Sequence, residues 1–439
     1  MRTVSKTVIG VDFGTQSARA VLVNAENGEI IYSCRKEYHY NSIPVPAIDC
    51  AENLPCATDY EMTLYELLRN VIPEEYRKTV AGICIDATSL TMVLLAEDGR
   101  ALSELDGWSE AAHARVKLWK YHRAQEKADE ALNLASNLQE PFLGRTGGSI
   151  SCEWMLPKLL EVRDEAPEIY SKIDLAMDLC EFLTFRLTGQ LVRSIGSLSY
   201  KCLWAEDLSF PERTFLNGLR AGFYEEYCHF LRGDVRMPGE CAGMLRSELT
   251  KRWGLPEQIP VATGMLDGHT SLATMGAFEP GDAALIVGTS NVCTVQDRKL
   301  QELKDVCGVA QDGMVTGSCG IDTGQSSTGN MLGWFVEHMA GWQIHREAEE
   351  RKISPHQVLA ERIQKPWENK VIAVDWWSGS RNAPCDLTLR GSMSGLEMDT
   401  KTEDIYLALL QAIACGTGTI LESLSGQGVE IRRVLATGG

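Results

Sequence analysis

The chain of 439 residues is 44% hydrophobic and 23% charged, which is typical of soluble globular proteins, and its length suits two domains. The net charge of −18 argues against a nucleic-acid partner, which would require basic patches, and no apolar run approaches the roughly eighteen residues of a membrane span. The fourteen cysteines include no C-x-x-C pair, so we expect reduced thiols in a cytoplasmic protein, without a disulfide framework.

The first part of the chain alternates strand and helix patterns. Residues 7–34 read as three strands, and residues 80–99 read as a strand, a loop and a second strand. Apolar residues recur at helical spacing in four further segments. These predicted helices cover residues 60–72, 114–137, 153–163 and 175–187, and the last should end in a glycine cap at Gly189.

The second part continues in the same way. A helix at 246–254 and a strand at 259–264 lead to a hairpin at 284–295, and a helix at 403–424 and a strand at 430–436 follow. Because the hairpin restarts the pattern, we place the domain boundary near residues 276–280, which gives domains 1–277 and 278–439. Strands mixed with helices in both halves predict the α/β class.

One motif occurs twice, as VIGVDFGTQSARAVLV at 8–23 and as ALIVGTSNVCTV at 284–295. Each copy predicts a β-hairpin whose turn exposes main-chain atoms, at Gly14-Thr15 and at Gly288-Thr289. Glycine lets the main chain approach a ligand closely, and N–H groups clustered with hydroxyls bind anions, most often phosphate. One such hairpin is commonly only a turn. Two copies suggest a nucleotide held between two related domains.

Two aspartates lie next to these elements. Asp267 follows the strand at 259–264 in a loop bracketed by Gly264 and Gly268, where a carboxylate can act as general base in phosphoryl transfer to an alcohol. Asp12 ends the first strand, where it can hold Mg²⁺ through water. The alternatives are a helix cap for Asp267 and an ordinary turn for Asp12. The duplicated hairpins favour the functional interpretation of both.

Several strings together resemble the FGGY family of carbohydrate kinases, within the actin-like ATPase superfamily. Besides VDFGTQSARAVLV, GMLDGHTSLATMGA and the second hairpin, they are IDATSLTMVL (85–94), VKLWKYHRAQEKADEA (116–131), GGSISCEWMLPKLLEV (147–162), SYKCLW (199–204), CGIDTGQSSTGN (319–330) and DWWSGSRN (375–382). The resemblance implies two related actin-like (ribonuclease H-like) domains with a cleft between them.

The resemblance also implies an activity. It indicates a kinase that uses ATP and Mg²⁺ to phosphorylate the terminal hydroxyl of a ketopentose, with the order of the strings most similar to members that act on L-ribulose. A kinase of xylulose, D-ribulose or ribitol is the first alternative, and a non-catalytic sugar- or nucleotide-binding relative is the second. A homodimer is compatible with this resemblance.

Site residues carry over from the family position by position. Asp267 aligns with the catalytic base, and Lys201, Ser89 and Asp322 align with sugar-binding positions. Asp322 departs from the usual glutamate by one methylene, which can change the preferred pentulose, and a solvated surface lysine is the alternative for Lys201. The positions implied for the nucleotide are Gly14, Thr15, Gln16, Gly288, Thr289, Gly438 and Gly439.

Two further expectations concern tryptophans and the chain end. Trp119 and Trp154 are better explained as core aromatics than as rings that stack on the sugar. VLATGG at 434–439 opens a segment that contacts the nucleotide in the family. The resemblance implies further residues that complete the second domain and the adenosine pocket, and we expect a chain ending at Gly439 to bind ATP poorly.

Overall fold

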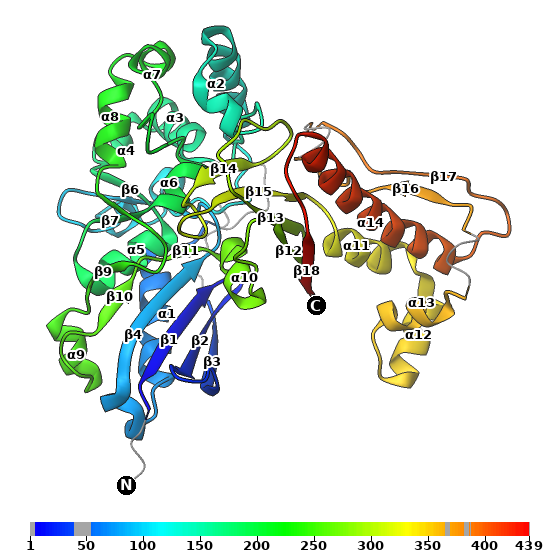
Figure 1. Ribbon diagram of the computed structural model, residues 1–439, viewed down its shortest axis with the longest axis horizontal. Helices are drawn as coiled ribbons and strands as arrows, with labels where there is room; N and C mark the ends of the chain where they lie inside the picture. Colours follow the sequence, from blue (N-terminus) through cyan, green and yellow to red (C-terminus); the bar gives the residue numbers. More distant parts are fainter. Residues whose placement is uncertain (1–4, 39–53, 365–368, 382–385, 387, 439) are drawn as a thin grey trace. The chain divides into compact units, whose positions relative to one another are not determined.

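The computed structural model describes residues 5–38, 54–364, 369–381, 386 and 388–438. The chain forms two compact units (Figure 1). Unit 1 comprises Met1–Leu143, Ile150–Thr270 and Ala310–Gly317, and unit 2 comprises Gly144–Ser149, Ser271–Val309 and Ser318–Gly439. Each unit mixes strands and helices, so the predicted α/β class is confirmed. The boundary expected after residue 277 stays a prediction.

Unit 1 is built on a sheet of order β3-β2-β1-β4-β10-β9. β1 (Thr7–Phe13) pairs antiparallel with β2 (Ser17–Asn24), which pairs antiparallel with β3 (Ile30–Glu37). On its other side β1 runs parallel to β4 (Val80–Ala87). β1 alternates buried and half-buried residues because successive side chains point to opposite faces of a sheet.

The rest of this sheet brings distant segments to β4. β10 (Pro260–Ala262) and β11 (Met265–Leu266) both pair parallel with β4, and β9 (Cys241–Met244) pairs antiparallel with β10. Strand β11 leads directly into helix α10 (Asp267–Met275). The predicted strand at 259–264 therefore corresponds to β10, and the separate strand β11 after it delivers Asp267 to the end of β4.

Helices cover this sheet with apolar faces. Helix α1 (Ala57–Asn70) buries Tyr60, Leu64, Leu67 and Leu68, which occupy positions i, i+4, i+7 and i+8 of the helix and so share one face. Helix α5 (Leu179–Thr188) ends at Gly189, whose φ of 74° is left-handed and whose N–H donates to the carbonyl of Phe185 at 2.7 Å. The glycine cap predicted from the sequence is confirmed.

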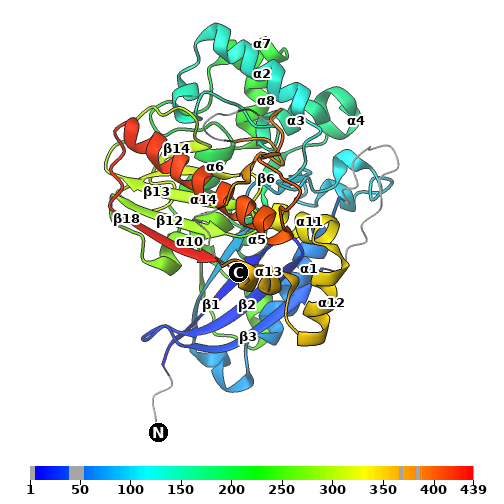
Figure 2. The ribbon, with the colours of Figure 1, turned by 90° about the vertical axis from the view of Figure 1, so that its right-hand side faces the viewer.

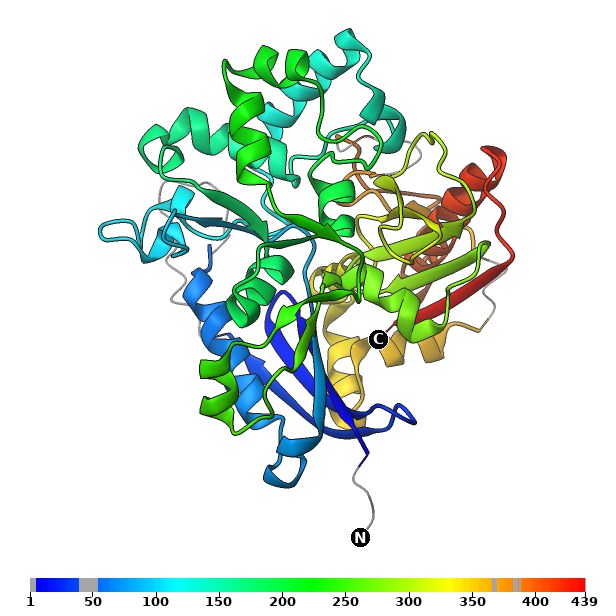
Figure 3. The same cartoon turned by 60° about the vertical axis from the view of Figure 1, so that its left-hand side comes forward.

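A helical layer forms a second core within unit 1. Figure 3 shows these cyan and green helices gathered away from the N-terminus. Its main helices are α2 (Gln125–Leu138), α3 (Met155–Glu165), α4 (Pro167–Tyr170), α7 (Arg213–Leu219) and α8 (Phe223–Phe230). Trp154 is only 3% exposed and belongs to this core, as expected for a core aromatic.

Shorter elements connect these layers. They are β5 (Met92–Leu95) with β6 (Leu175–Asp178), β7 (Val192–Ser194) with β8 (Asp234–Arg236), α6 (Ile195–Lys201), α9 (Ser247–Trp253) and the 3-10 helices η1 (Glu74–Thr79), η2 (Leu102–Glu104), η3 (Ala112–Ala114) and η4 (Pro141–Arg145).

Two of the predicted helices are partly wrong. The helix expected at 114–137 begins only at Gln125, because the backbone of Lys117 is hydrogen-bonded to that of Met92 in both directions, at 2.9 and 3.2 Å. The helix expected at 175–187 is preceded by β6, whose residues pair with β5. In both places, pairing with a distant strand overrides the local helical spacing.

Unit 2 repeats the sheet plan of unit 1. Its order is β14-β15-β13-β12-β18, in which β12 (Asp282–Val287) and β13 (Asn291–Asp297) form the second predicted hairpin. β15 (Cys319–Gln325) continues antiparallel beside β13, and β18 (Arg433–Gly438) runs parallel to β12. This is the arrangement of β3, β2, β1 and β4, with β14 (Gly308–Gln311) added at the edge. The expectation of two related domains is confirmed.

The helices of unit 2 form a core of their own. α11 (Gly329–Met339), α12 (Gly341–Arg351), α13 (Pro355–Arg362) and α14 (Thr402–Gly426) pack together, and β16 (Ile372–Val374) with β17 (Ser392–Ser394) lies beside α14. Figure 2 shows α14 in red over the sheet, and it contacts β15.

One helix in the described part of the chain is long and apolar enough to cross a membrane by length and composition alone. It is α14, with a mean hydropathy of 1.4 over eighteen residues. It contacts α11, α13 and β15, and such packing is typical of a core helix. The test is therefore weak evidence for a membrane span.

Candidate active site

Three carboxylates meet where parallel strands of unit 1 end. Asp12 of β1 pairs in register with Asp86 of β4, and Met265 of β11 pairs with the same Asp86. Asp267 begins α10 two residues after Met265. Since parallel strands end at the same edge of a sheet, the register places Asp86 between Asp12 and Asp267.

The negative charges of these carboxylates repel one another. Burial raises the pKa of Asp86 to about 8, and the negative charges of Asp12 and Asp267 add to the effect. Its Oδ1 atom is buried without a hydrogen-bond partner among the described residues. A cation at this position would relieve the repulsion.

Asp267 is stabilised as an anion by its neighbours. Burial raises its pKa to about 6, but the N–H of Gly268 donates to its Oδ1 at 2.7 Å, and the N–H of Ser89 and the charge of Lys201 also lower the pKa. The result is a carboxylate that is ionised at pH 7 and basic enough to accept a proton.

The structure therefore places Ser89, Lys201 and Asp267 near one another within unit 1. Ser89 follows β4, and Lys201 is the last residue of α6. Asp322 lies in β15 of unit 2, where it is 7% exposed and pairs in register with Thr294. Its carbonyl accepts from the N–H of Cys307 at 2.8 Å.

The tip of the first hairpin is fixed from two sides. The N–H of Gly14 donates to the carbonyl of Ser17 at 3.1 Å, which closes the turn around Thr15 and Gln16. The indole Nε1 of Trp119 donates to the hydroxyl of Thr15 at 3.1 Å. Trp119 thus contacts a predicted phosphate-binding residue, an interaction that the sequence analysis did not anticipate.

The second hairpin is held by the start of α11. The carbonyl of Gly288 accepts from the hydroxyl of Thr328 and the N–H of Gly329, each at 2.9 Å, and the carbonyl of Thr289 accepts from the N–H of Thr328 at 3.1 Å. A Cβ on Gly329 would approach the carbonyl oxygen of Gly288 to 2.5 Å. Only glycine therefore allows α11 to begin this close to the hairpin.

Gly438 lies beside the same hairpin. It pairs in register with Val287, the residue before Gly288, and a Cβ on Gly438 would collide with the carbonyl of Val287. The structure thus brings the predicted nucleotide residues Gly288, Thr289 and Gly438 together in unit 2. Gly439 lies outside the described residues.

Two of the sequence strings meet behind this hairpin. Gln325, from CGIDTGQSSTGN, donates to the carboxylate of Asp375, from DWWSGSRN, at 2.6 Å. Its amide oxygen accepts from Asn291 at 2.7 Å and from the hydroxyl of Thr417 at 2.7 Å. This network connects β13, β15 and α14, so these residues hold strand β13 of the hairpin in place.

Sequence reasoning missed two residues of this region. Asp86 was only part of a string, although its place at the end of a buried strand resembles that of Asp12. Lys158 is fully buried, and its ammonium donates to the carbonyls of Leu90 at 3.0 Å and Leu118 at 2.8 Å. Burial lowers its pKa to about 7. Leu90 has a φ of 44°, so Lys158 holds a strained residue next to Ser89.

Comparison with known proteins decides the family. The model of the FGGY family of carbohydrate kinases, N-terminal domain, matches residues 7–274, and that of the C-terminal domain matches residues 283–439. The chain belongs to the FGGY family of carbohydrate kinases. The resemblance inferred from the sequence is confirmed, and the chain is an ATP-dependent kinase with an alcohol group as acceptor.

Individual relatives and solved structures agree with this assignment. The chain is 34% identical to "Ribulokinase" of Halalkalibacterium halodurans, covering 99% of this chain and 79% of the relative. It is 35% identical to "Ribulokinase" of Mycolicibacterium smegmatis, with the same coverage. The crystal structure of a xylulose kinase from Rhodospirillum rubrum is similar with a TM-score of 0.76 at 20% identity, covering 99% of this chain and 82% of that one. At that identity the likeness shows the fold alone.

Proposed function

We propose that this FGGY kinase transfers the γ-phosphoryl group of ATP to the terminal hydroxyl of L-ribulose, which yields L-ribulose 5-phosphate and ADP. Relatives with the name "Ribulokinase", 33–35% identical over 99% of the chain, support this choice of sugar. The environment of Asp267 is the observation that supports the proposed chemical step, because it makes this carboxylate a suitable general base.

In the proposed step, the sugar hydroxyl oxygen attacks the γ-phosphorus in line. The bond between that phosphorus and the β–γ bridging oxygen breaks, ADP leaves, and the hydroxyl proton passes to Asp267. With a pKa of about 6, Asp267 is ionised at pH 7 before the step begins. The hydroxyl of Ser89 and the ammonium of Lys201 bind the sugar near this base, and Asp322 supplies a further acceptor for a sugar hydroxyl.

The proposal extends to the phosphate and metal sites that the family resemblance implies. The tips at Gly14–Gln16 and Gly288–Thr289, with Gly438, bind the phosphate tail of ATP through N–H groups and hydroxyls. Asp12 and Asp86 would hold Mg²⁺, which supplies charge neutralisation at the phosphates. In the described ranges no group of three or more His, Cys, Asp or Glu is arranged to hold a metal ion, and Mg²⁺ is commonly bound through only one or two carboxylates with several waters.

One observation supports other sugars or polyols as alternative substrates. Asp322 stands where the family usually has glutamate, and its side chain is one methylene shorter. A shorter carboxylate leaves more room at a sugar hydroxyl, so xylulose, D-ribulose or the polyol ribitol remain candidate substrates. A non-catalytic binding role would require that Asp267 take no proton from any of them.

An assay of sugar-dependent ADP release across these sugars and polyols tests the proposal. We expect the highest kcat/KM with L-ribulose, and a loss of about 10²–10⁴-fold in kcat for Asp267→Asn, because amide nitrogen cannot accept the proton. Asp98→Asn is the matched control, since Asp98 is exposed and, among the described residues, pairs with Arg100 alone. Turnover that survives Asp267→Asn would eliminate the general base. Absence of ADP release with every sugar would favour the binding role.

A further inference from the structure

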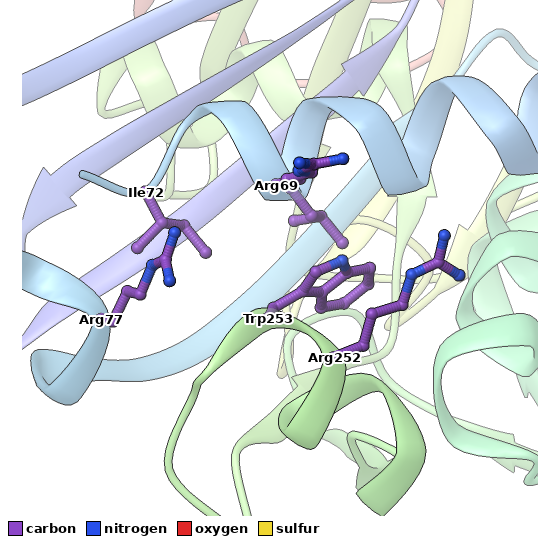
Figure 4. Close-up of a pocket in the computed structure, with 6 residues that line it drawn as sticks. Arg69, Ile72, Arg77, Arg252 and Trp253 are labelled. Atoms are coloured by element: carbon purple, nitrogen blue, oxygen red, sulfur yellow. The ribbon is translucent and has the colours of Figure 1, made fainter. Parts of the chain in front are cut away.

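A cavity of about 370 Å³ lies in unit 1, away from the three carboxylates (Figure 4). It is lined by the last turn of α1 and the residues after it, by η1 and by α9. η1 leads into the first residue of β4, whereas Asp86 lies at the other end of that strand. The six steps from Val80 to Asp86 span about 20 Å. The cavity is therefore at the opposite edge of the sheet from the active site.

Three arginines from different elements line this cavity. Arg69 comes from α1, Arg77 from η1 and Arg252 from α9, and Figure 4 shows them arranged around Trp253. Within the described residues, none of the three has a carboxylate or hydrogen-bond partner. Other arginines of unit 1, such as Arg163 and Arg220, pair with carboxylates. Three unneutralised cations at one hollow are unusual in a chain of net charge −18.

The floor of the cavity is rigid and apolar. Trp253 is 5% exposed, Ile72 is 4% exposed and Leu68 is fully buried. The indole meets the ring of Tyr65 edge-on at 5.8 Å, and the guanidinium of Arg252 lies over the same tyrosine ring at 5.8 Å. These contacts restrict the indole and the guanidinium of Arg252, so the site loses little side-chain entropy when it binds a ligand.

We propose that this cavity, bounded by Arg69, Arg77, Arg252 and Trp253, binds the phosphate group of a small molecule. Guanidinium groups present two parallel N–H donors that match phosphate oxygens, and a dianion would neutralise positive charge that has no carboxylate partner among the described residues. The volume accommodates a phosphate with a small organic group against the indole. The phosphate can come from free inorganic phosphate or from a phosphorylated metabolite. The site is separate from the proposed catalytic step.

Isothermal titration of the full chain with inorganic phosphate, ribose 5-phosphate and ribose tests this proposal. We expect both phosphate compounds to bind and ribose not to bind at this site. The double variant Arg77→Gln/Arg252→Gln should weaken the binding at least tenfold, while Arg100→Gln, an exposed arginine paired with Asp98, should leave it unchanged. Any phosphate binding in the active site is unaffected by the double variant, so the difference isolates the cavity.

The arms of this titration separate the two sources. Tighter binding of ribose 5-phosphate than of inorganic phosphate identifies a phosphorylated metabolite, and equal affinity identifies free phosphate. A third variant, Arg77→Lys/Arg252→Lys, keeps the charge but removes the paired donors and should bind with intermediate affinity. The proposal is overturned if neither phosphate compound binds, or if the glutamine variant, folded by circular dichroism, binds both as tightly as the unaltered chain.

Discussion

Asp267 lies among groups that shift its pKa in opposite directions. Burial and the charge of Asp12 raise the pKa, whereas the N–H groups of Gly268 and Ser89 and the ammonium of Lys201 lower it. The resulting pKa of about 6 leaves a base that is ionised at neutral pH, with a pKa only about one unit below the pH of the solution. Small changes in this environment should therefore be visible in the rate.

The pH dependence of the rate follows from this balance. Protonated Asp267 cannot accept the hydroxyl proton, so kcat/KM should be half-maximal at about pH 6, approach its full value above about pH 7 and fall about tenfold per pH unit well below pH 6. Lys201→Met removes a positive charge that lowers the pKa, so the acid limb should move to higher pH. The measurement is kcat/KM for the sugar between pH 5 and 8. An acid limb at the same pH in both proteins would contradict the effect of the Lys201 charge on the pKa of this base.

At the scale of elements, Lys158 of α3 connects two segments that carry site residues. Its ammonium holds the carbonyl of Leu90, next to Ser89, and that of Leu118, next to Trp119. The N–H of Leu90 donates on its other side to Asp178 at 2.8 Å. The strained turn after β4 is thus fixed by a helix that contributes no residue to the proposed chemistry.

Lys158→Met tests this role. The methionine keeps the volume but leaves the carbonyls without their donor, which should lower the free energy of unfolding by about 2 kcal/mol. It should also lower kcat, because the backbone next to Ser89 is released. Urea unfolding and kcat are the measurements, and Lys127→Met, which removes a partly exposed pair with Asp164, should cost less than about 1 kcal/mol. Unchanged stability and rate in Lys158→Met would contradict this assignment.

The elements that were predicted correctly are those that depend on residues close together in the sequence. Both Gly-Thr hairpins and the helix α14 were predicted from turn residues and periodicity. Residues 114–124 and 175–178 were wrongly predicted as helix, because Lys117 and β6 pair with segments distant in the chain. The same limit applies to the site. Asp12 and Asp267 stand beside recognisable motifs, but the place of Asp86 depends on strand register, and Lys158 acts on carbonyls 68 and 40 residues away.

For the whole molecule, the repeated sheet plan implies that each unit has hydrophobic cores of its own. The cores of unit 1 include Leu160 of α3, and a core of unit 2 includes Leu409 of α14; neither side chain is exposed. Apart from the shared hairpin motif, the sequence analysis did not anticipate that β15 and β18 repeat the positions of β3 and β4. Each unit should therefore have a stability of its own.

Differential scanning calorimetry tests whether the two units unfold in separate transitions. Leu160→Ala and Leu409→Ala each leave a cavity that costs about 2–5 kcal/mol, and we expect each substitution to lower a different one of two unfolding transitions. Exposed Leu138, on α2, supplies the control, since Leu138→Ala should move neither transition measurably. A single transition lowered equally by both core substitutions would show one cooperative unit.

The two units are not consecutive in the chain, since residues 310–317 belong to unit 1 although they follow the first hairpin of unit 2. In unit 1 the carbonyl of Gly313 lies where a Cβ on Gly196 would meet it at 2.5 Å, and Gly313 also packs against Tyr200 of α6. On the ribosome, unit 1 therefore emerges without the segment that supports the helix of Lys201. Its folding is completed only after translation has passed Gly317, when the first strands of unit 2 are already outside. We therefore expect unit 1 to complete its fold only after part of unit 2 has been synthesised.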